Sequence, residues 1–229
     1  IVAAFGQILS QEILDIPPLG SLNIHASLLP KYRGASPIQH AIIDGEERTG
    51  ITIMQMDAGI DTGDMLYRKE TAVLPQDNYE TLHDRLAALG GEAIVEALAL
   101  LEQGKLEPAK QDEDLSCYAP LIGKEMGEID FSREALAIDR HIRGMTPWPS
   151  AFTGYQGKQL KIWRAEPAMA EDVRGHVPGE ILRTDRDCVT VAAGQGALRI
   201  YELQLAGKKR MSAHDFLLGV KMRPGEVLG

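Results

Sequence analysis

Residues 19–45 read LGSLNIHASLLPKYRGASPIQHAIIDG, and this stretch indicates the fold class. Leu19–His25 has the pattern of a turn that leads into a short strand. Ser36-Pro37-Ile38-Gln39 is typical of a helix start, because serine can cap the first turn, proline suits the first helical position and glutamine can reach back to the cap. Gly45 suits a helix end. Alternating short strands and helices predict a layered α/β domain.

The segments on both sides continue this alternation. The opening Ile1–Phe5 is apolar and starts without methionine, so we expect a buried strand and a chain that begins inside a fold. Gly50–Met56 predicts a further strand. Between Asn78 and Gln103, apolar residues recur every three or four positions, which predicts a long amphipathic helix. We therefore expect a first domain over residues 1–103.

The pattern changes after a polar segment. Residues 104–117 are charged and include a proline, so they are interpreted as a linker. The second domain, residues 118–229, is expected to contain one helix near 132–143. Short strands separated by glycine-containing turns then predict a small β-barrel, with strands at 151–155, 159–165, 179–182, 188–192 and 198–203.

Composition limits the class of protein. Hydrophobic residues make up 44% and charged residues 25%, as in a soluble globular protein. No stretch approaches the roughly 20 consecutive apolar residues that a membrane helix requires, so no membrane partner is expected. Cys117 and Cys188 lie 71 positions apart, a spacing that matches neither a metal knuckle nor a CxxC redox pair. A cytoplasmic location follows from these unpaired thiols.

The charge is unevenly distributed. A net charge of −9 argues against a general nucleic-acid binder. Residues 150–229, however, contain 12 Lys and Arg against nine Asp and Glu, a local net charge of +3. A surface in this part of the chain can still contact a phosphate backbone.

Asn23 and His25 are the first candidate functional pair. Residues two apart on a strand point to the same side, and the carboxyl end of a strand in an open α/β sheet is where ligands usually bind. An amide donor beside a protonatable ring suits an oxyanion that develops on a carbonyl. The alternative is a hydrogen-bonded core histidine and a turn asparagine.

Asp57–Asp64 is the second candidate, a glycine-containing loop with three carboxylates directly after a strand. It is interpreted either as a solvated turn or as a cation site. A calcium loop needs denser oxygen ligands and a glutamate that this loop lacks. If its strand neighbours that of Asn23, Asp61 can reach His25, stabilise a protonated ring and relay a proton.

Together the motifs Asn-x-His, Ser-Leu-Leu-Pro-x-Tyr-x-Gly and Met-Asp-x-Gly-x-Asp-Thr-Gly resemble the formyltransferase family that uses 10-formyltetrahydrofolate. The resemblance implies a Rossmann-like sheet whose first strands, with a loop that contacts the tRNA acceptor end, precede Ile1. It implies a catalytic trio of Asn23, His25 and Asp61, without a metal. It also implies a folate site formed by Gln7, Ile8, Leu9, Ser27, Leu28, Leu29 and Pro30.

Segments 119–131, 143–152 and 207–216 resemble the members of this family that formylate methionyl-tRNA. The resemblance implies initiator methionyl-tRNA as the acceptor, a monomeric enzyme and an OB-like second domain that touches tRNA. Candidate tRNA contacts, which are alternatively solvated turns and strand edges, are Arg33, Lys158, Lys161, Arg164, Lys208, Lys209 and Arg210. Three other functions stay open: formylation of a sugar-nucleotide amine, hydrolysis of the formyl donor, and a non-catalytic RNA-binding module.

Overall fold

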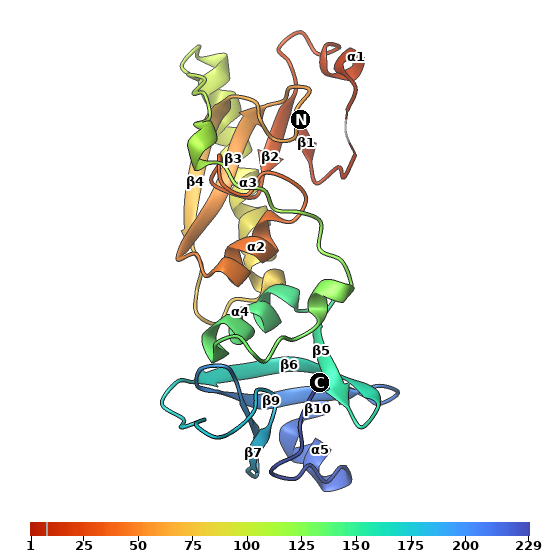
Figure 1. Cartoon of the computed structure of the whole chain (residues 1–229). Coiled ribbons are helices and arrows are strands. Elements are labelled where there is room, and N and C mark those ends of the chain that lie inside the picture. Colours follow the sequence, from red (N-terminus) through yellow and green to blue (C-terminus); the bar gives the residue numbers. More distant parts are fainter. Residues whose placement is uncertain (8) are drawn as a thin grey trace. The chain divides into compact units, whose positions relative to one another are not determined.

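The structure, a computed structural model, describes residues 1–7 and 9–229. The chain folds into two compact units (Figure 1). The first comprises Ile1–Ala41 and Glu46–Ile122, and the second comprises Ile42–Gly45 and Gly123–Gly229. The elements up to residue 122 are β1 (Val2–Ala3), α1 (Gln11–Leu14), β2 (Leu22–His25), α2 (Pro37–Asp44), β3 (Arg48–Gln55), β4 (Met65–Ala72), α3 (Tyr79–Glu102) and the 3-10 turn η1 (Glu113–Leu115).

The first unit is built on a four-stranded sheet in the order β1-β2-β3-β4. β1 is parallel to β2, whereas β2–β3 and β3–β4 are antiparallel pairs. In this register His25 lies opposite Thr52. The mixed sheet confirms the predicted α/β class, and the strands at 22–25 and 48–55 lie where the sequence predicts them.

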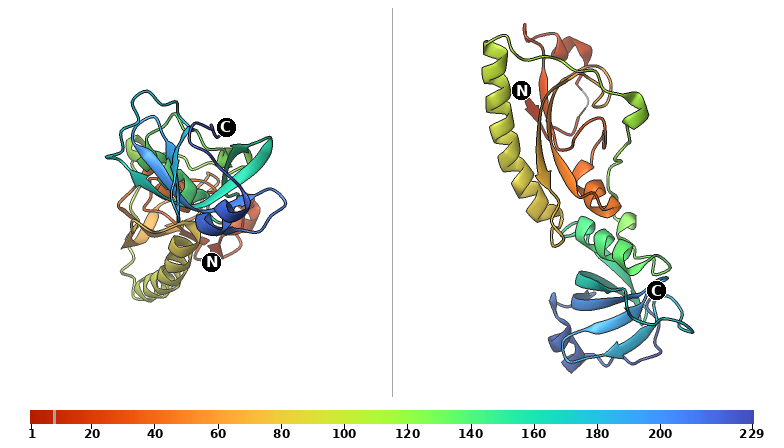
Figure 2. Two further views of the ribbon diagram at one scale, coloured as in Figure 1. Left: turned by 90° about the horizontal axis from the view of Figure 1, so that it is seen from below. Right: turned by 90° about the vertical axis from the view of Figure 1, so that its left-hand side faces the viewer.

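Helix α3 packs along one face of this sheet (Figure 2). Its boundaries confirm the prediction, because Asn78 caps it in a reciprocal capping box with Thr81 and Gln103 is its C-cap. At Gly90 the helix lies close to the sheet: a Cβ there would lie 3.1 Å from Ile24 Cγ2. The buried face of the helix is the apolar face that the sequence predicts, with Leu82, Leu86, Gly90, Ala93 and Ala97.

Two local features are absent from the predictions. β4 is absent from the predicted strands, because its residues MLYRKETA alternate in burial but carry charged side chains on the outer face. At the start of α2, Ser36 Oγ accepts a hydrogen bond from the backbone N–H of Ile122 (3.1 Å), so this hydroxyl ties the helix start to a distant segment. The contact of Ser36 depends on a residue 86 positions away.

The second unit contains an antiparallel sheet of six strands, in the order β5-β6-β9-β8-β7 with β10 beside β9. Helix α4 packs against β6. The remaining elements are η2 (Glu125–Gly127), α4 (Ala135–Met145), β5 (Ala151–Tyr155), β6 (Lys158–Ala168), β7 (Ile181–Thr184), β8 (Val189–Ala192), β9 (Ala197–Leu205), β10 (Met211–Ser212) and α5 (Ala213–Gly219).

The edges β5 and β7 of this sheet are joined by a third segment. Leu228 donates its backbone N–H to Gly179 O (2.9 Å) just before β7, and Gly229 donates to Gly154 O (3.1 Å) in β5. Within the described residues, β5 and β7 do not pair with each other. The five predicted strands are present, but a closed OB-like barrel is not confirmed. No described helix is both long and apolar enough to cross a membrane.

Candidate active site

Asn23 and His25 lie on β2 at the strand's C-terminal end, on the same side of the sheet. β2 is held on both sides, by β1 and by β3, so the backbone that carries these side chains is fixed. Asn23 is half-buried and His25 is only 5% exposed. The strand therefore presents an amide and a nearly buried imidazole together.

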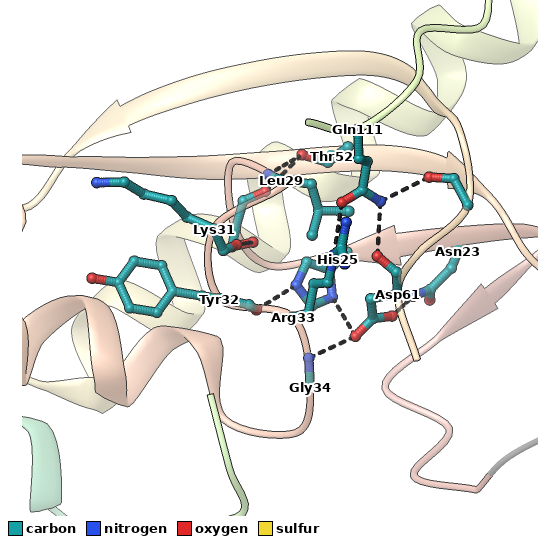
Figure 3. A network of polar contacts seen from close by, with 12 residues as sticks. Asn23, His25, Leu29, Lys31, Tyr32, Arg33, Gly34, Thr52, Asp61 and Gln111 are labelled. Carbon is teal, nitrogen blue, oxygen red and sulfur yellow. Dashed lines mark hydrogen bonds and ion pairs between the residues drawn. The ribbon is translucent and has the colours of Figure 1, made fainter. Parts of the chain in front are cut away.

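Asp61 approaches both side chains from the loop after β3 (Figure 3). Its Oδ2 lies 3.5 Å from His25 Nδ1 and accepts the backbone N–H of Gly34 at 2.9 Å. Its Oδ1 lies 3.4 Å from Asn23 Nδ2. Amide, imidazole and carboxylate thus converge, because β3, which precedes the Asp61 loop, neighbours β2.

The two ring nitrogens of His25 face different oxygen acceptors. Nε2 lies 2.9 Å from the carbonyl oxygen of Tyr32, which only accepts, so Nε2 carries a proton. Nδ1 faces the Asp61 carboxylate, a second acceptor. Both ring nitrogens of His25 therefore face oxygen acceptors, and the Asp61 carboxylate lies beside the ring.

The three carboxylates of the loop have different partners. Asp57 Oδ1 accepts from Gly59 N (2.9 Å) and Thr62 Oγ1 (2.7 Å), which is the turn predicted as one alternative. Asp64 pairs with Lys110 at 2.8 Å. Of these three carboxylates, only Asp61 faces Asn23 and His25. Among the residues that the structure describes, no group of three or more His, Cys, Asp or Glu is placed to hold a metal ion.

The segment after β2 forms a tight loop that is anchored to β3. Thr52 Oγ1 donates to Ser27 O (2.7 Å) and accepts from Leu29 N (3.1 Å). Ser27 Oγ donates to Lys31 O (2.6 Å). Leu29 is buried in a cluster with Met54 and Met65. Of the side chains predicted to line the folate site, Ser27 and Leu29 are buried, whereas Leu28 and Pro30 are half-buried.

The other predicted folate residues precede α1. Gln7 is exposed and Leu9 is half-buried. Ile8 lies outside the described residues. The role of these three residues in folate binding stays a prediction.

Comparison with known proteins identifies the family of this chain. Residues 1–98 match the family described as Formyl transferase, and residues 121–221 match Formyl transferase, C-terminal domain. Methionyl-tRNA formyltransferase of Geotalea uraniireducens is 51% identical over 229 residues, which cover 100% of this chain and 72% of that protein. The chain belongs to the methionyl-tRNA formyltransferase family.

Two solved structures share the formyltransferase fold. HypX from Aquifex aeolicus, in complex with tetrahydrofolic acid, has a TM-score of 0.64 at 23% identity, covering 89% of this chain and 36% of that chain. Methionyl-tRNA formyltransferase from Clostridium thermocellum has a TM-score of 0.54 at 24% identity, covering 70% and 68%. At these identities the likeness concerns the fold.

A polar network beside Asp61 is absent from the sequence predictions. Gln111, which the sequence places in a linker, donates to the carbonyls of Asp61 and Gly63, both at 2.8 Å. Its Oε1 accepts from Arg33 Nε (2.9 Å), and Arg33 forms a bidentate pair with Glu113 at 2.8 Å. No local pattern marks Gln111, because its partners at Asp61 and Arg33 are 50 and 78 positions away.

Arg33 differs from the other predicted tRNA contacts. It is 8% exposed, and the hydrogen bond to Glu113 raises the pKa of its guanidinium, while the same interaction lowers the pKa of the Glu113 carboxyl. Gln111 and Glu113 therefore accept hydrogen bonds from the guanidinium of Arg33. A cavity of about 440 Å³ lies beside it, lined by Arg33, Ile60, Thr62, Ser116, Cys117 and Tyr118.

The remaining basic candidates belong to the C-terminal formyltransferase domain. Lys161 Nζ and Arg210 Cζ lie 5.8 and 4.8 Å from the ring centroid of Trp163, and Arg164 Cζ lies 4.5 Å from that of Tyr201. Glu202 pairs with Arg210 and Arg164, so part of this charge is neutralised. Lys158, Lys208 and Lys209 are exposed. Their contacts with tRNA stay a prediction.

Proposed function

We propose that the chain transfers a formyl group from 10-formyltetrahydrofolate to the amino group of methionine on initiator tRNA. The observation that carries this proposal is the convergence of Asn23, His25 and Asp61, whose polar atoms approach within 3.5 Å. Relatives named methionyl-tRNA formyltransferase, about half identical over the whole chain, support the choice of acceptor.

The proposed donor site lies beside this trio. Ser27, Leu28, Leu29 and Pro30 form its wall next to His25, and Gln7, Ile8 and Leu9 hold the pterin ring through their backbone. Support comes from the way Thr52 fixes the backbone of residues 27 and 29. A wall with a fixed backbone holds the formyl carbon at a constant distance from the catalytic groups.

In the proposed reaction the methionine amine attacks the formyl carbon. The carbonyl oxygen of the tetrahedral intermediate gains negative charge, which Asn23 and protonated His25 stabilise. The distance from His25 Nδ1 to Asp61 is 3.5 Å, so an entering oxyanion can share that proton. Each such donor contributes on the order of 3 kcal/mol to transition-state stabilisation.

Asp61 provides the proton path. Its carboxylate compensates the charge of His25, and the amine proton moves through Asp61, with water, to the folate nitrogen that leaves. The tetrahedral intermediate then collapses. The bond between the folate nitrogen and the formyl carbon breaks, and the new amide bond to the methionine nitrogen remains. The reaction needs no metal in this proposal.

The second part of the chain is the proposed tRNA-contacting domain. We propose domains at 1–103 and 118–229, a connecting segment at 104–117, and a monomeric protein in the cytoplasm. An OB-like closure of the second domain is supported by the segment that bonds to both β5 and β7. The basic residues proposed to bind tRNA there are Lys158, Lys161, Arg164, Lys208, Lys209 and Arg210.

A substitution of Asp61 tests the catalytic assignment. In the purified protein, we expect Asp61→Ala to lower kcat for formylation of charged initiator tRNA by at least about 100-fold, because general acid–base catalysis is lost. The thermal midpoint should stay close to wild type. Near-normal formylation by Asp61→Ala would contradict the assignment of this residue.

The same assay separates the alternative functions. Wild-type protein is given charged initiator tRNA, a 4-amino-sugar nucleotide, or no acceptor. Transfer to the tRNA supports the proposal. Transfer only to the sugar amine, formate release without an acceptor, or salt-sensitive RNA binding without folate binding would each replace it.

A further inference from the structure

Segment 109–113 crosses the back of the Asp61 loop and is bonded to it at several points. Ala109 exchanges two backbone hydrogen bonds with Met65, each 2.8 Å long. Gln111 then reaches the loop itself through its side chain (Figure 3). This segment is therefore part of the structure that surrounds the site.

The amide of Gln111 has only one orientation that satisfies its neighbours. The carbonyls of Asp61 and Gly63 accept, so they must face the NH₂ group, while Arg33 Nε donates and must face the oxygen. Turning the amide would oppose donor to donor and acceptor to acceptor. A glutamine at this position joins an arginine to two loop carbonyls, which neither glutamate nor leucine can do.

Asp61 needs support from behind. Its φ is +55°, in the left-handed region that is sparsely populated by residues other than glycine. Its loop neighbours from Asp57 to Ile60 are exposed. Its distances to Asn23 and His25 are long, at 3.4 and 3.5 Å. These two interactions alone hold the carboxylate loosely.

Two consecutive residues, Arg33 and Gly34, hold the two ends of Asp61. The Gly34 N–H donates to the carboxylate, and the Arg33 side chain reaches the Asp61 carbonyl through Gln111. Arg33 is itself fixed, because its N–H donates to Cys117 O (2.9 Å) and its carbonyl accepts from Ala119 N (2.7 Å). The Gly34 N–H therefore holds the carboxylate of Asp61, and Arg33 holds its carbonyl through Gln111. Both interactions start from the same fixed backbone segment.

We propose that Gln111, supported by Arg33 and Glu113, is a positioning residue for Asp61. The effect of this positioning on catalysis rests on the proposed formyl transfer. Gln111 touches no substrate in this proposal. Gln111 sets the position of the carboxylate that faces His25. In this proposal Arg33 holds Gln111 in place, and it is not the tRNA contact that the sequence predicts.

Kinetics of Gln111→Leu test this role. A small displacement of a catalytic group can cost about 100-fold in rate, so we expect kcat to fall about 10- to 100-fold. KM for 10-formyltetrahydrofolate should stay within about twofold. Gln111→Glu, which still accepts from Arg33 but cannot donate to the loop carbonyls, should lose as much. Gln103→Leu, the same change at an exposed helix end, is the matched control and should be normal.

A double substitution distinguishes positioning from general loss of structure. In an Asp61→Asn background, followed in single turnovers, Gln111→Leu should change the rate by less than about twofold, because the group it positions is already disabled. Equal losses in both backgrounds, or wild-type kcat in Gln111→Leu or Gln111→Glu, would overturn the proposal.

Amide exchange gives a readout that does not depend on activity. Gly34 N–H bonds to the Asp61 carboxylate, so Gln111→Leu should speed its hydrogen exchange, while Gln103→Leu should not. Unchanged exchange at Gly34 would overturn the positioning role. If wild-type protein transfers no formyl group, the proposed function fails, and this measurement still decides the role of Gln111.

Discussion

At the scale of single residues, Thr52 and His141 each place a polar group inside the protein. Thr52 is fully buried and serves two backbone groups of the loop after β2, Ser27 O and Leu29 N. His141 on α4 has its Nε2 buried, without a hydrogen-bond partner among the described residues. Each group makes a separate prediction.

Thr52→Val should destabilise the protein and weaken folate binding. Valine has the same shape but leaves Ser27 O and Leu29 N without that partner, and each buried unsatisfied group costs about 1–3 kcal/mol. We expect a loss of at least about 2 kcal/mol in denaturant unfolding, with a raised KM for the folate donor. Thr52→Ser keeps the hydroxyl and should behave nearly as wild type. Equal stability of the valine and serine variants would refute this account.

His141 predicts a pH dependence of stability. Burial is the main cause that lowers the pKa of His141 from its ordinary 6.5, and the positive charge of the nearby Arg133 lowers it further. The unfolded chain therefore binds a proton at a pH where the folded protein does not. Stability is fully present above about pH 6.5 and declines as pH falls toward the folded pKa, by at most about 1.4 kcal/mol per pH unit. His141→Phe should flatten the unfolding free energy between about pH 7 and 5, and an unchanged slope would contradict the prediction.

At the scale of elements, the site depends on how closely the Asp61 loop approaches the end of β3. Gln55 donates its backbone N–H to Asp64 O (2.9 Å), which closes the loop at its base. A Cβ on Gly63 would lie only 1.8 Å from Gln55 O. Only a glycine lets the two backbones meet there.

Gly63→Ala should therefore displace the loop that carries Asp61. We expect at least about a tenfold fall in kcat, because the carboxylate moves away from His25. Gly91→Ala is the matched control: a Cβ there meets nothing within 4 Å, and alanine favours the helix. Normal turnover by Gly63→Ala would show that the loop tolerates the shift.

At the scale of the whole molecule, the second unit carries basic side chains beside aromatic rings on β6 and β9. Arg210 lies over the ring of Trp163, and Arg164 lies over the ring of Tyr201. Trp163 Nε1 donates a hydrogen bond to Gln204 (3.2 Å). Such a surface suits a nucleic-acid backbone, although Glu202 offsets part of its charge. The prediction at this scale concerns salt.

Lys161→Gln, Arg164→Gln and Arg210→Gln should each raise KM for tRNA without changing KM for the folate donor. Removing one phosphate-binding side chain should reduce the slope of log KM against log salt by about 0.7–0.9. Arg174→Gln, on an exposed loop of the same unit, is the control and should leave the slope unchanged. Equal slopes in all four variants would exclude these residues as phosphate ligands.

Local sequence patterns were sufficient to predict the α/β class, the ends of α3 and the strands at β2 and β3, whereas the family resemblance was needed to group Asn23, His25 and Asp61 as one site. Apolar periodicity, capping residues and polar side chains two positions apart on a strand are all visible in short stretches. Folding in three dimensions was needed to reveal the charged strand β4, the open strand pairing of the second sheet, and the relay through Gln111. The difference arises from distance along the chain. A side chain such as Arg33 has no signal for its partner when that partner arrives 80 positions later, and only folding brings their charges together.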